Sequence, residues 1–341
     1  MAELDEKLYG RQLVALSEDV EWEDVPPIPA TEPEGSLAAI AFPPKYAEAA
    51  SYLRIVMANN EMSERAFRLT AHIIEMNPAH YTVWLYRFRI MEALKLPFDN
   101  EIEWLNDVSL QHLKNYQIWH HRQLLVDAHY PTIAGDKSKI SPLVRSETQF
   151  IGKMLVADAK NYHVWSYRQW LVRRLGMWDI SELLATQNYI EEDLRNNSAW
   201  SHRFFLVFSD PAASSGEAVH ATEADPKVPH AIIERELKYA REKIQLAPQN
   251  QSPWNYLKGV LAKAGRGIET EKAFVETFVR KVGEGDDDEV VLSTHALDLL
   301  ADIHVAEGEK AKAAVCLERL SEKWDPIRAG YWKLRKQQLA F

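Results

Sequence analysis

Three basic residues occupy equivalent places in a repeated sequence pattern and could bind an anion. Lys114, Lys160 and Arg195 each precede an asparagine, in the segments "LKNYQIWHHR", "AKNYHVWSYR" and "LRNNSAWSHR". The asparagine is expected to begin a helix, where free backbone N–H groups and the helix dipole attract negative charge. A cation at this end is unfavourable unless an anion joins it, so the pattern favours a phosphate or carboxylate site. Ordinary solvated surface lysines are the alternative interpretation.

The residue three positions after each of these places varies from repeat to repeat. The position is occupied by Thr82, Gln117, His163, Ser198 and Ser252, and in three repeats it follows a tyrosine, namely Tyr81, Tyr116 or Tyr162. A polar position that varies beside a potential anion site is where each repeat could be specialised for its ligand. His163 could equally be a structural histidine.

A tryptophan marks each repeat. The residues are Trp84, Trp119, Trp165, Trp200 and Trp254, at spacings of 35, 46, 35 and 54 residues. The two longer spacings contain segments near 128–142 and 209–229 that break the helical pattern and are expected to be surface insertions. The underlying unit of about 35 residues has the length of a helix-turn-helix repeat, so the sequence predicts five helix pairs.

The residue types within the unit predict structural roles. The tryptophans are expected in the core, because an indole ring buries a large apolar area. The arginines three residues later are expected to pair with an acidic residue of an adjacent helix; they are Arg87, Arg122, Arg168 and Arg203. The asparagines are expected to be N-caps of the second helices; they are Asn115, Asn161, Asn196 and Asn250.

Composition limits the class of protein. The 341 residues are 46% hydrophobic and 26% charged, with a formal net charge of -10, which argues against a nucleic-acid or anionic-membrane surface. The single cysteine, Cys316, excludes an intrachain disulfide and a zinc site of several thiolates. The sequence shows no secretory signal and no stretch with the apolar length of a membrane span, so a cytoplasmic protein is expected.

The chain divides into two parts by composition. Residues 1–42 are acidic and rich in proline, and they predict an extended or partly disordered arm, which Trp22 could dock locally. Residues 43–341 predict one all-α solenoid domain, because apolar residues recur at helical spacing and glycine is scarce. The tryptophan repeats span about 61–265, and a helical cap follows them.

The repeated Asn-Tyr-x-x-Trp-x-x-Arg pattern resembles that of protein prenyltransferase alpha subunits. The segments "AKNYHVWSYRQW", "DLRNNSAWSHRFF" and "QSPWNYLKGVL" are most similar to the alpha subunit shared by protein farnesyltransferase and type I geranylgeranyltransferase. The resemblance implies a right-handed, crescent-shaped superhelix of antiparallel helical hairpins, similar to tetratricopeptide repeats. It also implies a heterodimer with a beta subunit, which holds the catalytic zinc, and Mg²⁺ for farnesyl transfer. No metal ligand is expected in this chain.

The resemblance also assigns roles to individual residues. Lys114 and Tyr162 match the residues that contact the isoprenoid diphosphate, and both would be catalytic. Gln117 matches the residue that binds the C-terminal carboxylate of a CaaX substrate protein, such as a small GTPase. Tyr81, Tyr116 and His163 would line the same peptide-binding surface. The implied ligands are farnesyl or geranylgeranyl diphosphate and the CaaX protein, with no nucleic acid.

The repeats at the two ends depart from the pattern. The first repeat has Ala79 and His80 in place of Lys and Asn, and the fifth has Leu257 in place of the arginine. These repeats are expected to serve packing or an interface. Two alternatives stay open at the level of sequence: the alpha subunit of the Rab geranylgeranyltransferase, and a non-catalytic scaffold of the tetratricopeptide kind.

Overall fold

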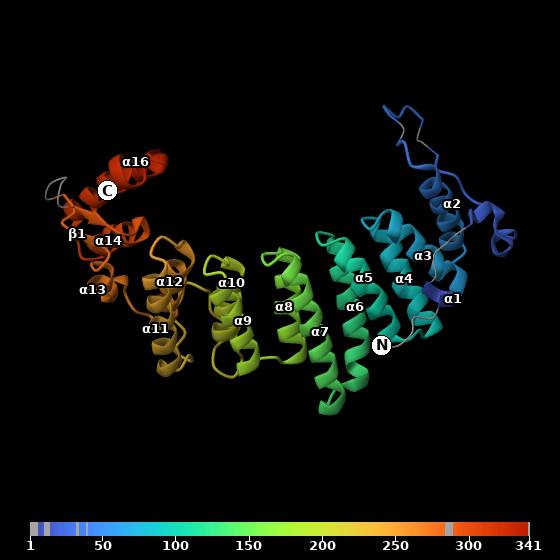
Figure 1. The fold of residues 1–341 in the computed structure, drawn as a ribbon, viewed down its shortest axis with the longest axis horizontal. Coiled ribbons are helices and arrows are strands. Elements are labelled where there is room, and N and C mark those ends of the chain that lie inside the picture. Colours follow the sequence, from blue (N-terminus) through green and yellow to red (C-terminus); the bar gives the residue numbers. More distant parts are fainter. Residues whose placement is uncertain (1–5, 10–13, 32–33, 39, 284–288, 340–341) are drawn as a thin grey trace. The chain divides into compact units, whose positions relative to one another are not determined.

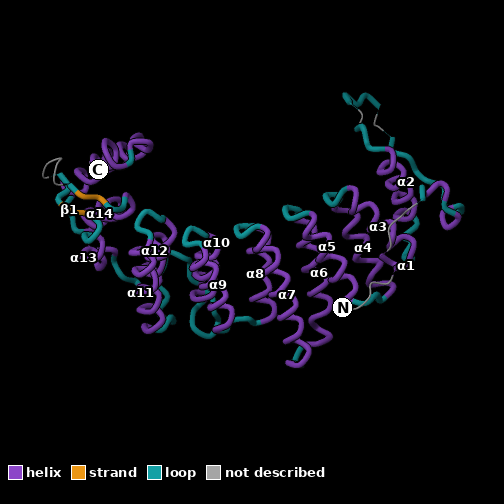
Figure 2. The backbone as a smooth tube through the Cα atoms, in the orientation of Figure 1, coloured by secondary structure: helices purple, strands orange, loops and turns teal. Residues whose placement is uncertain are grey.

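Antiparallel helix pairs make up most of the described chain in this computed structural model (Figures 1 and 2). The structure describes residues 6–9, 14–31, 34–38, 40–283 and 289–339. Parts of the predicted arm, at 1–5, 10–13, 32–33 and 39, lie outside these ranges, as do 284–288 and 340–341. The chain forms two compact units, Met1–Leu171 and Val172–Phe341.

The first unit contains the helices that carry the first three repeats. Their bounds are α1 (Glu6–Tyr9), α2 (Pro44–Ala58), α3 (Glu64–Met76), α4 (Tyr81–Leu94), α5 (Phe98–Gln111), α6 (Tyr116–Ile133), α7 (Lys137–Ala157) and α8 (Tyr162–Leu175). The boundary between the two units falls within α8. Each repeat is one helical hairpin, so α3–α4, α5–α6 and α7–α8 are the hairpins of this unit (Figure 1).

The second unit contains two further hairpins and the C-terminal helices. Their bounds are α9 (Ile180–Glu192), α10 (Asn197–Phe208), α11 (His230–Leu246), α12 (Gln251–Ala264), α13 (Lys272–Val275), β1 (Val279–Arg280), β2 (Val290–Val291), α14 (Thr294–Ala306), α15 (Lys310–Arg319) and α16 (Ala329–Gln338). The strands β1 and β2 pair antiparallel, Val279 with Val291 and Arg280 with Val290. The predicted all-α class is therefore confirmed, with this two-residue ribbon as a small addition that helical periodicity could not reveal (Figure 2).

The predicted N-caps begin the second helices of four repeats. In each case the asparagine Oδ1 accepts a hydrogen bond from a backbone N–H of the first turn, which would otherwise lack a partner. The donors and distances are Gln117 at 2.8 Å for Asn115, His163 at 3.0 Å for Asn161, Ala199 at 3.2 Å for Asn196 and Ser252 at 3.2 Å for Asn250.

The repeat tryptophans lie in the core, as predicted. All five are between 1% and 5% exposed. Within each unit, the indole ring contacts the aromatic residue that follows the tryptophan of the next hairpin by two positions. The ring centroids are 5.2 Å apart for Trp84 and His121, 5.2 Å for Trp119 and Tyr167, and 5.1 Å for Trp200 and Tyr256. These contacts pack α4 on α6, α6 on α8 and α10 on α12.

Buried arginine–glutamate pairs link successive hairpins. Arg87 of α4 donates to both oxygens of Glu101 in α5, at 2.8 Å each. Arg122 of α6 pairs in the same way with Glu147 of α7, and Arg203 of α10 with Glu236 of α11. The predicted pairing with an adjacent helix is confirmed for these three arginines. Arg168 is also buried, with its guanidinium 5.6 Å from the Trp165 ring.

Each of these glutamates also accepts a hydrogen bond from the second helix of its own hairpin. The partners are His121 Nε2 for Glu101 at 2.7 Å, Tyr167 Oη for Glu147 at 2.6 Å and Tyr256 Oη for Glu236 at 2.7 Å. Burial alone would raise the pKa of Glu101, but the Arg87 charge and the His121 hydrogen bond outweigh it and lower that pKa to about 2. The carboxylate is therefore charged inside the core and fully partnered, which is the condition under which a buried ion pair is tolerated.

The described part of the N-terminal arm packs on the first helices. Trp22 is 3% exposed and meets Tyr52 of α2 edge-on, with ring centroids 5.3 Å apart. Arg65 of α3 donates to Asp24 at 2.6 Å, and Arg68 pairs with Glu21. The proposed docking by Trp22 is confirmed.

The two insertions differ in structure. The segment near 128–142 is mostly helical, because it lengthens the end of α6 and the start of α7, and each added part tolerates one proline, Pro131 or Pro142. The segment near 209–229 has little regular structure. It is fastened to α12 by Lys263, whose Nζ donates to the backbone carbonyls of Val219 and His220.

Candidate functional site

The loops that lead into α6 and α8 lie against each other at one edge of the first unit (Figure 1). We call residues 112–115 and 158–161 the edge loops. The Nδ2 of the N-cap Asn161 donates to the carbonyl of Leu113 at 2.8 Å. The ammonium of Lys114 pairs with the carboxylate of Asp158. Stacking of the hairpins therefore brings Lys114 beside the start of α8, where Tyr162 is the first helical residue.

Lys114 is held only at its tip. Its side chain is 74% exposed, whereas that of Asp158 is 24% exposed. The other oxygen of Asp158 accepts a hydrogen bond from the backbone N–H of Lys160 at 3.3 Å. The hydrogen bond from Lys114 lowers the pKa of Asp158, against a smaller opposing effect of burial, so the aspartate is ionised at neutral pH. The result is a fixed cation at a helix start.

Tyrosines cover this edge of the first unit. Tyr81, Tyr116 and Tyr162 are the first residues of α4, α6 and α8, and they are 61%, 61% and 76% exposed. The ring of Tyr162 meets that of His163 edge-on, with centroids 5.7 Å apart. Three exposed tyrosines on neighbouring helix starts are characteristic of a surface that contacts a ligand or another protein.

Gln117 lies in the first turn of α6, three residues after Lys114. It is 8% exposed, and its backbone N–H donates to the N-cap Asn115. Among the described residues, its side-chain amide has no hydrogen-bond partner. A largely buried amide whose N–H donors have no protein partner can bind a carboxylate, because the carboxylate oxygens accept hydrogen bonds from those donors. The bound carboxylate then replaces the water that burial of the amide removed.

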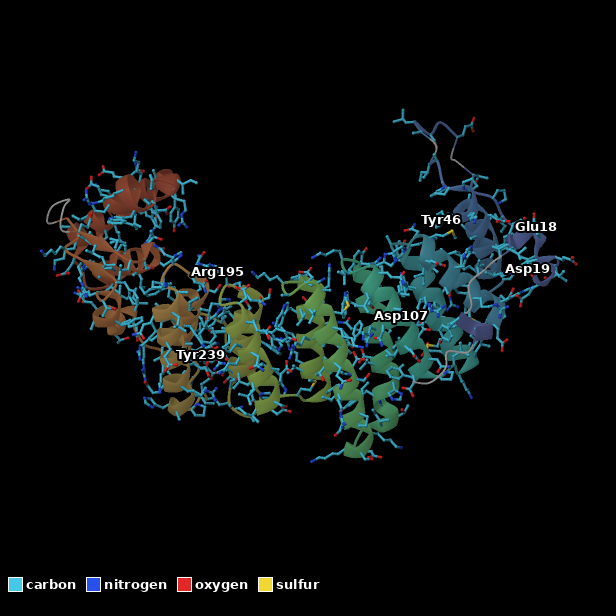
Figure 3. All side chains as sticks on the ribbon, in the orientation of Figure 1. Glu18, Asp19, Tyr46, Asp107, Arg195 and Tyr239 are labelled. Carbon is cyan, nitrogen blue, oxygen red and sulfur yellow. The ribbon has the colours of Figure 1, made fainter. Side chains whose placement is uncertain are left out.

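The predicted residues lie at the starts of several helices, which belong to two units. Lys114, Gln117 and Tyr116 lie at the start of α6, and Tyr162 and His163 at the start of α8. Arg195 belongs to the second unit, beside the loop that leads into α10, whereas Tyr239 lies farther along its helix, α11 (Figure 3). Sequence reasoning missed Asp158, since its partner lies 44 residues away. A weak signal was present: an acidic residue two positions before a repeat lysine.

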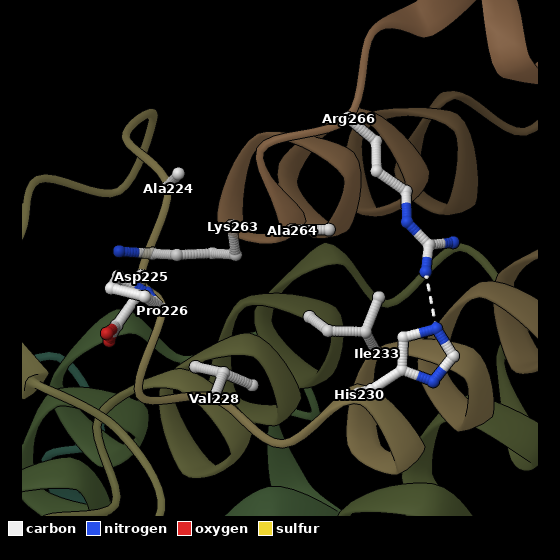
Figure 4. A pocket seen from close by; sticks show the side chains of 9 residues that line it. All are labelled: Ala224, Asp225, Pro226, Val228, His230, Ile233, Lys263, Ala264 and Arg266. Atoms are coloured by element: carbon white, nitrogen blue, oxygen red, sulfur yellow. Dashed lines mark hydrogen bonds between the residues drawn. The ribbon is translucent and has the colours of Figure 1, made fainter.

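A hollow of 360 Å³ lies in the second unit, between the 209–229 insertion and α12 (Figure 4). Its charged groups are already engaged. Lys263 binds the backbone of the insertion, and Arg266 donates to His230 at 2.9 Å and pairs with Glu234. These contacts attach the insertion to its helix, and the hollow has no group left over for an anion.

One cluster of metal-ligand residue types occurs among the residues that the structure describes: His304, Glu307 and Glu309. The ammonium groups of Lys272 and Lys312 bind the two carboxylates at 2.7 Å each. Their positive charges oppose a divalent cation at the same oxygens, so the cluster fits a surface ion-pair network better than a metal site.

No helix in the described part of the chain has both the length and the apolar character needed to cross a membrane.

Comparisons with known proteins agree on the family. A family model described as "Protein prenyltransferase alpha subunit repeat" matches residues 63–94, 98–129, 144–175, 180–210 and 233–264, which are the five hairpins. The farnesyltransferase/geranylgeranyltransferase type-1 alpha subunit of Candida albicans is 33% identical over 94% of this chain and 97% of its own. This chain belongs to the protein prenyltransferase alpha subunit family. The repeats are therefore those of prenyltransferase alpha subunits, and ordinary tetratricopeptide repeats are excluded as their class.

Further matches place the chain within this family. The type-1 alpha subunit of Schizosaccharomyces pombe is 39% identical over 72% of this chain and 74% of its own. The solved structure of Candida albicans protein geranylgeranyltransferase-I complexed with GGPP is similar with a TM-score of 0.80 and 33% identity, covering 93% of this chain and 97% of that one. The type-2 alpha subunit of Mus musculus, by contrast, is 26% identical and is covered over only 35% of its length. The chain is thus an alpha subunit of the farnesyltransferase/geranylgeranyltransferase type-1 kind, and the Rab-transferase alternative is the weaker match.

Proposed function

We propose that this chain binds a beta subunit and that the pair transfers a farnesyl or geranylgeranyl group from its diphosphate to a cysteine of a CaaX protein, such as a small GTPase. The observation that carries the proposal is the edge formed by Lys114, Gln117 and Tyr162 on two neighbouring hairpins. Membership in the alpha-subunit family and the likeness to a structure containing GGPP support it.

Lys114 is the proposed catalytic cation. As the bond from the isoprenoid carbon to the diphosphate breaks, negative charge grows on the departing oxygen. An ammonium group fixed nearby stabilises this charge more in the transition state than in the ground state, because the charge is larger there. The N–H groups at the start of α6 add positive potential at the same place. Tyr162 would donate its hydroxyl hydrogen to the same diphosphate.

The remaining edge residues are proposed to bind the peptide. The Gln117 amide would donate to the terminal carboxylate of the CaaX segment. Tyr81, Tyr116 and His163 would pack against the peptide or the partner subunit. Because Gln117 is neutral and set back from the edge, it would select for a chain that ends at the correct distance.

Zinc enters the proposal only through the partner. The charged cluster around His304 does not fit a metal site, so we assign none to this chain. Zinc held by the beta subunit would supply a thiolate by lowering the pKa of the substrate cysteine. Mg²⁺ in farnesyl transfer and a cytoplasmic location belong to the same proposal.

Co-expression with a beta subunit tests this function. The Lys114→Ala variant should transfer the prenyl group about 10²- to 10³-fold more slowly, with a smaller change in the KM for the diphosphate. Lys153→Ala removes an exposed lysine from α7 and is the matched control. The proposal fails if the full chain transfers the group without a second subunit, if it binds peptides only as a scaffold, or if Lys114→Ala retains the wild-type rate.

A further inference from the structure

The ion pair between Lys114 and Asp158 connects two hairpins at the candidate site. Asp158 is the C-cap of α7, and its backbone N–H donates to the carbonyl of Met154 at 3.0 Å. Its Oδ1 accepts from the backbone of Lys160, and its Oδ2 receives the ammonium of Lys114. The aspartate is therefore fixed by its own turn, and the long lysine side chain is fixed by the aspartate.

The loop that carries Lys114 is held by the same hairpin. The side chain of Asn161 donates to the carbonyl of Leu113, the residue immediately before Lys114. The third hairpin thus fixes both the backbone and the side-chain tip of this lysine. One contact to the side chain and one to the peptide group just before it restrict the ammonium more than solvent alone would.

Stability does not account for this ion pair. An exposed lysine–carboxylate pair contributes little net stability, because the free-energy cost of ordering the lysine side chain offsets most of the gain. The main effect of Asp158 is therefore on where the ammonium lies, and much less on the folding of the chain.

The pair is a property of the central repeats. At the lysine position the first repeat has Ala79, and at the aspartate position the second and fifth repeats have His112 and Ala247. The first and second hairpins thus cannot form the pair, nor can the fourth and fifth.

We propose that Asp158 is a positioning residue for Lys114, fixing its ammonium group at the edge so that its remaining N–H donors meet the departing diphosphate. An ammonium group has three donors, so binding Asp158 leaves two for diphosphate oxygens. Preorganising the cation before the reaction removes the cost of ordering it in the transition state. This inference rests on the proposed function and adds a residue that does not itself touch the substrate.

Two substitutions separate the ion pair from the turn. In Asp158→Ser, the hydroxyl can still accept from the Lys160 N–H, but it is too short to reach the Lys114 ammonium. In Asp158→Asn, the amide oxygen can still accept from the Lys160 N–H, but an NH2 group replaces the oxygen that accepts from Lys114. Asn77→Ser is the matched control, since Asn77 holds the same position in the first repeat and makes the same turn with the Ala79 N–H, where the repeat has no lysine.

The experiment measures kcat and KM of the co-expressed heterodimer. Asp158→Ser should lower kcat about 10- to 100-fold with the KM for the diphosphate changed less than about threefold. Asp158→Asn should lower kcat by a similar factor, because the lysine loses its acceptor although the turn and the size of the side chain are kept. In a Lys114→Ala background, Asp158→Ser should cause no further loss, since the group that it positions is gone.

Other results would overturn the inference. If Asp158→Ser lowers the KM for the diphosphate and leaves kcat unchanged, Asp158 is a competitor that the ligand displaces. If Asp158→Ser and Asn77→Ser have equal effects, the turn matters and the ion pair does not. If the wild-type heterodimer transfers no prenyl group at all, the proposed function fails, and this outcome is distinct from a failure of the positioning role.

Discussion

The interior and the edge of the first unit both contain a cation paired with a carboxylate from the next hairpin, and the two pairs do different work. Arg122 and Glu147 are fully buried and joined by two hydrogen bonds, at 2.8 and 2.7 Å. Lys114 and Asp158 are joined at one tip, with the lysine largely exposed. Both arise from the same stacking of hairpins.

The two ion pairs differ in whether water can solvate a charge that has lost its partner. A buried guanidinium that loses its carboxylate has no solvent to replace it, so the pair is required for folding. An exposed ammonium that loses its carboxylate is solvated at once, so the fold tolerates the loss. Arginine, with its planar set of donors, suits the first role. Lysine suits the second, because its compact ammonium can bind Asp158 and keep donors for a ligand.

The largest predicted effect is on the interior pair. Arg122→Ala should lower the free energy of unfolding of the heterodimer by about 3–5 kcal/mol, because Glu147 would remain charged and buried. Chemical denaturation followed by circular dichroism measures it. Arg145→Ala, which removes an exposed arginine of α7, is the control. A loss below about 1 kcal/mol would contradict the distinction between the two pairs.

The second prediction concerns acid. Because the pKa of Glu101 is about 2 in the folded chain and higher in the unfolded chain, its contribution to stability is fully present above about pH 4.5 and is lost as the pH falls toward 2. Glu101→Gln should therefore flatten the fall of the unfolding free energy between these pH values. Asp107→Asn, which removes an exposed carboxylate of the same helix, is the comparison. Equal slopes in Glu101→Gln and wild type would show that this carboxylate does not titrate with folding.

The smallest predicted effect is on the edge. Lys114→Ala should change the free energy of unfolding by less than about 1 kcal/mol, although it removes the proposed catalytic cation. The same denaturation experiment measures it. If Lys114→Ala destabilised the heterodimer as much as Arg122→Ala, its loss of activity would be a folding defect.

The local features of the repeat could be predicted from the sequence. Asn115 and Asn161 begin helices because a side-chain oxygen next to a free helix start is satisfied within two or three residues. Trp84 is buried because its indole ring recurs at helical spacing and removes a large apolar area from water when it packs in the core. The arginine pairs followed from the same reasoning, since a buried guanidinium requires an acid nearby.

The features that depend on stacking could not be predicted. The partner of Lys114 is Asp158. The register in which one hairpin stacks on the next determines which acidic residue lies beside the lysine. The helical form of the 128–142 insertion also escaped prediction, because Pro131 and Pro142 lie near enough to the helix ends for the helices to continue around them. The candidate site residues Lys114, Gln117 and Tyr162 came from the family resemblance, since periodicity alone identifies no ligand.

The arginine–glutamate ladder has a direction, which limits how the chain can be shortened. Arg87, Arg122 and Arg203 each pair with a glutamate of the hairpin that follows, so a truncation after α6 would leave Arg122 without a counter-ion. The natural array ends differently. In the fifth hairpin the position of the arginine is occupied by Leu257, which is fully buried. An apolar side chain needs no carboxylate from a following hairpin. A shortened array would tolerate a new C-terminal end only after its last arginine is replaced by an apolar residue in the same way.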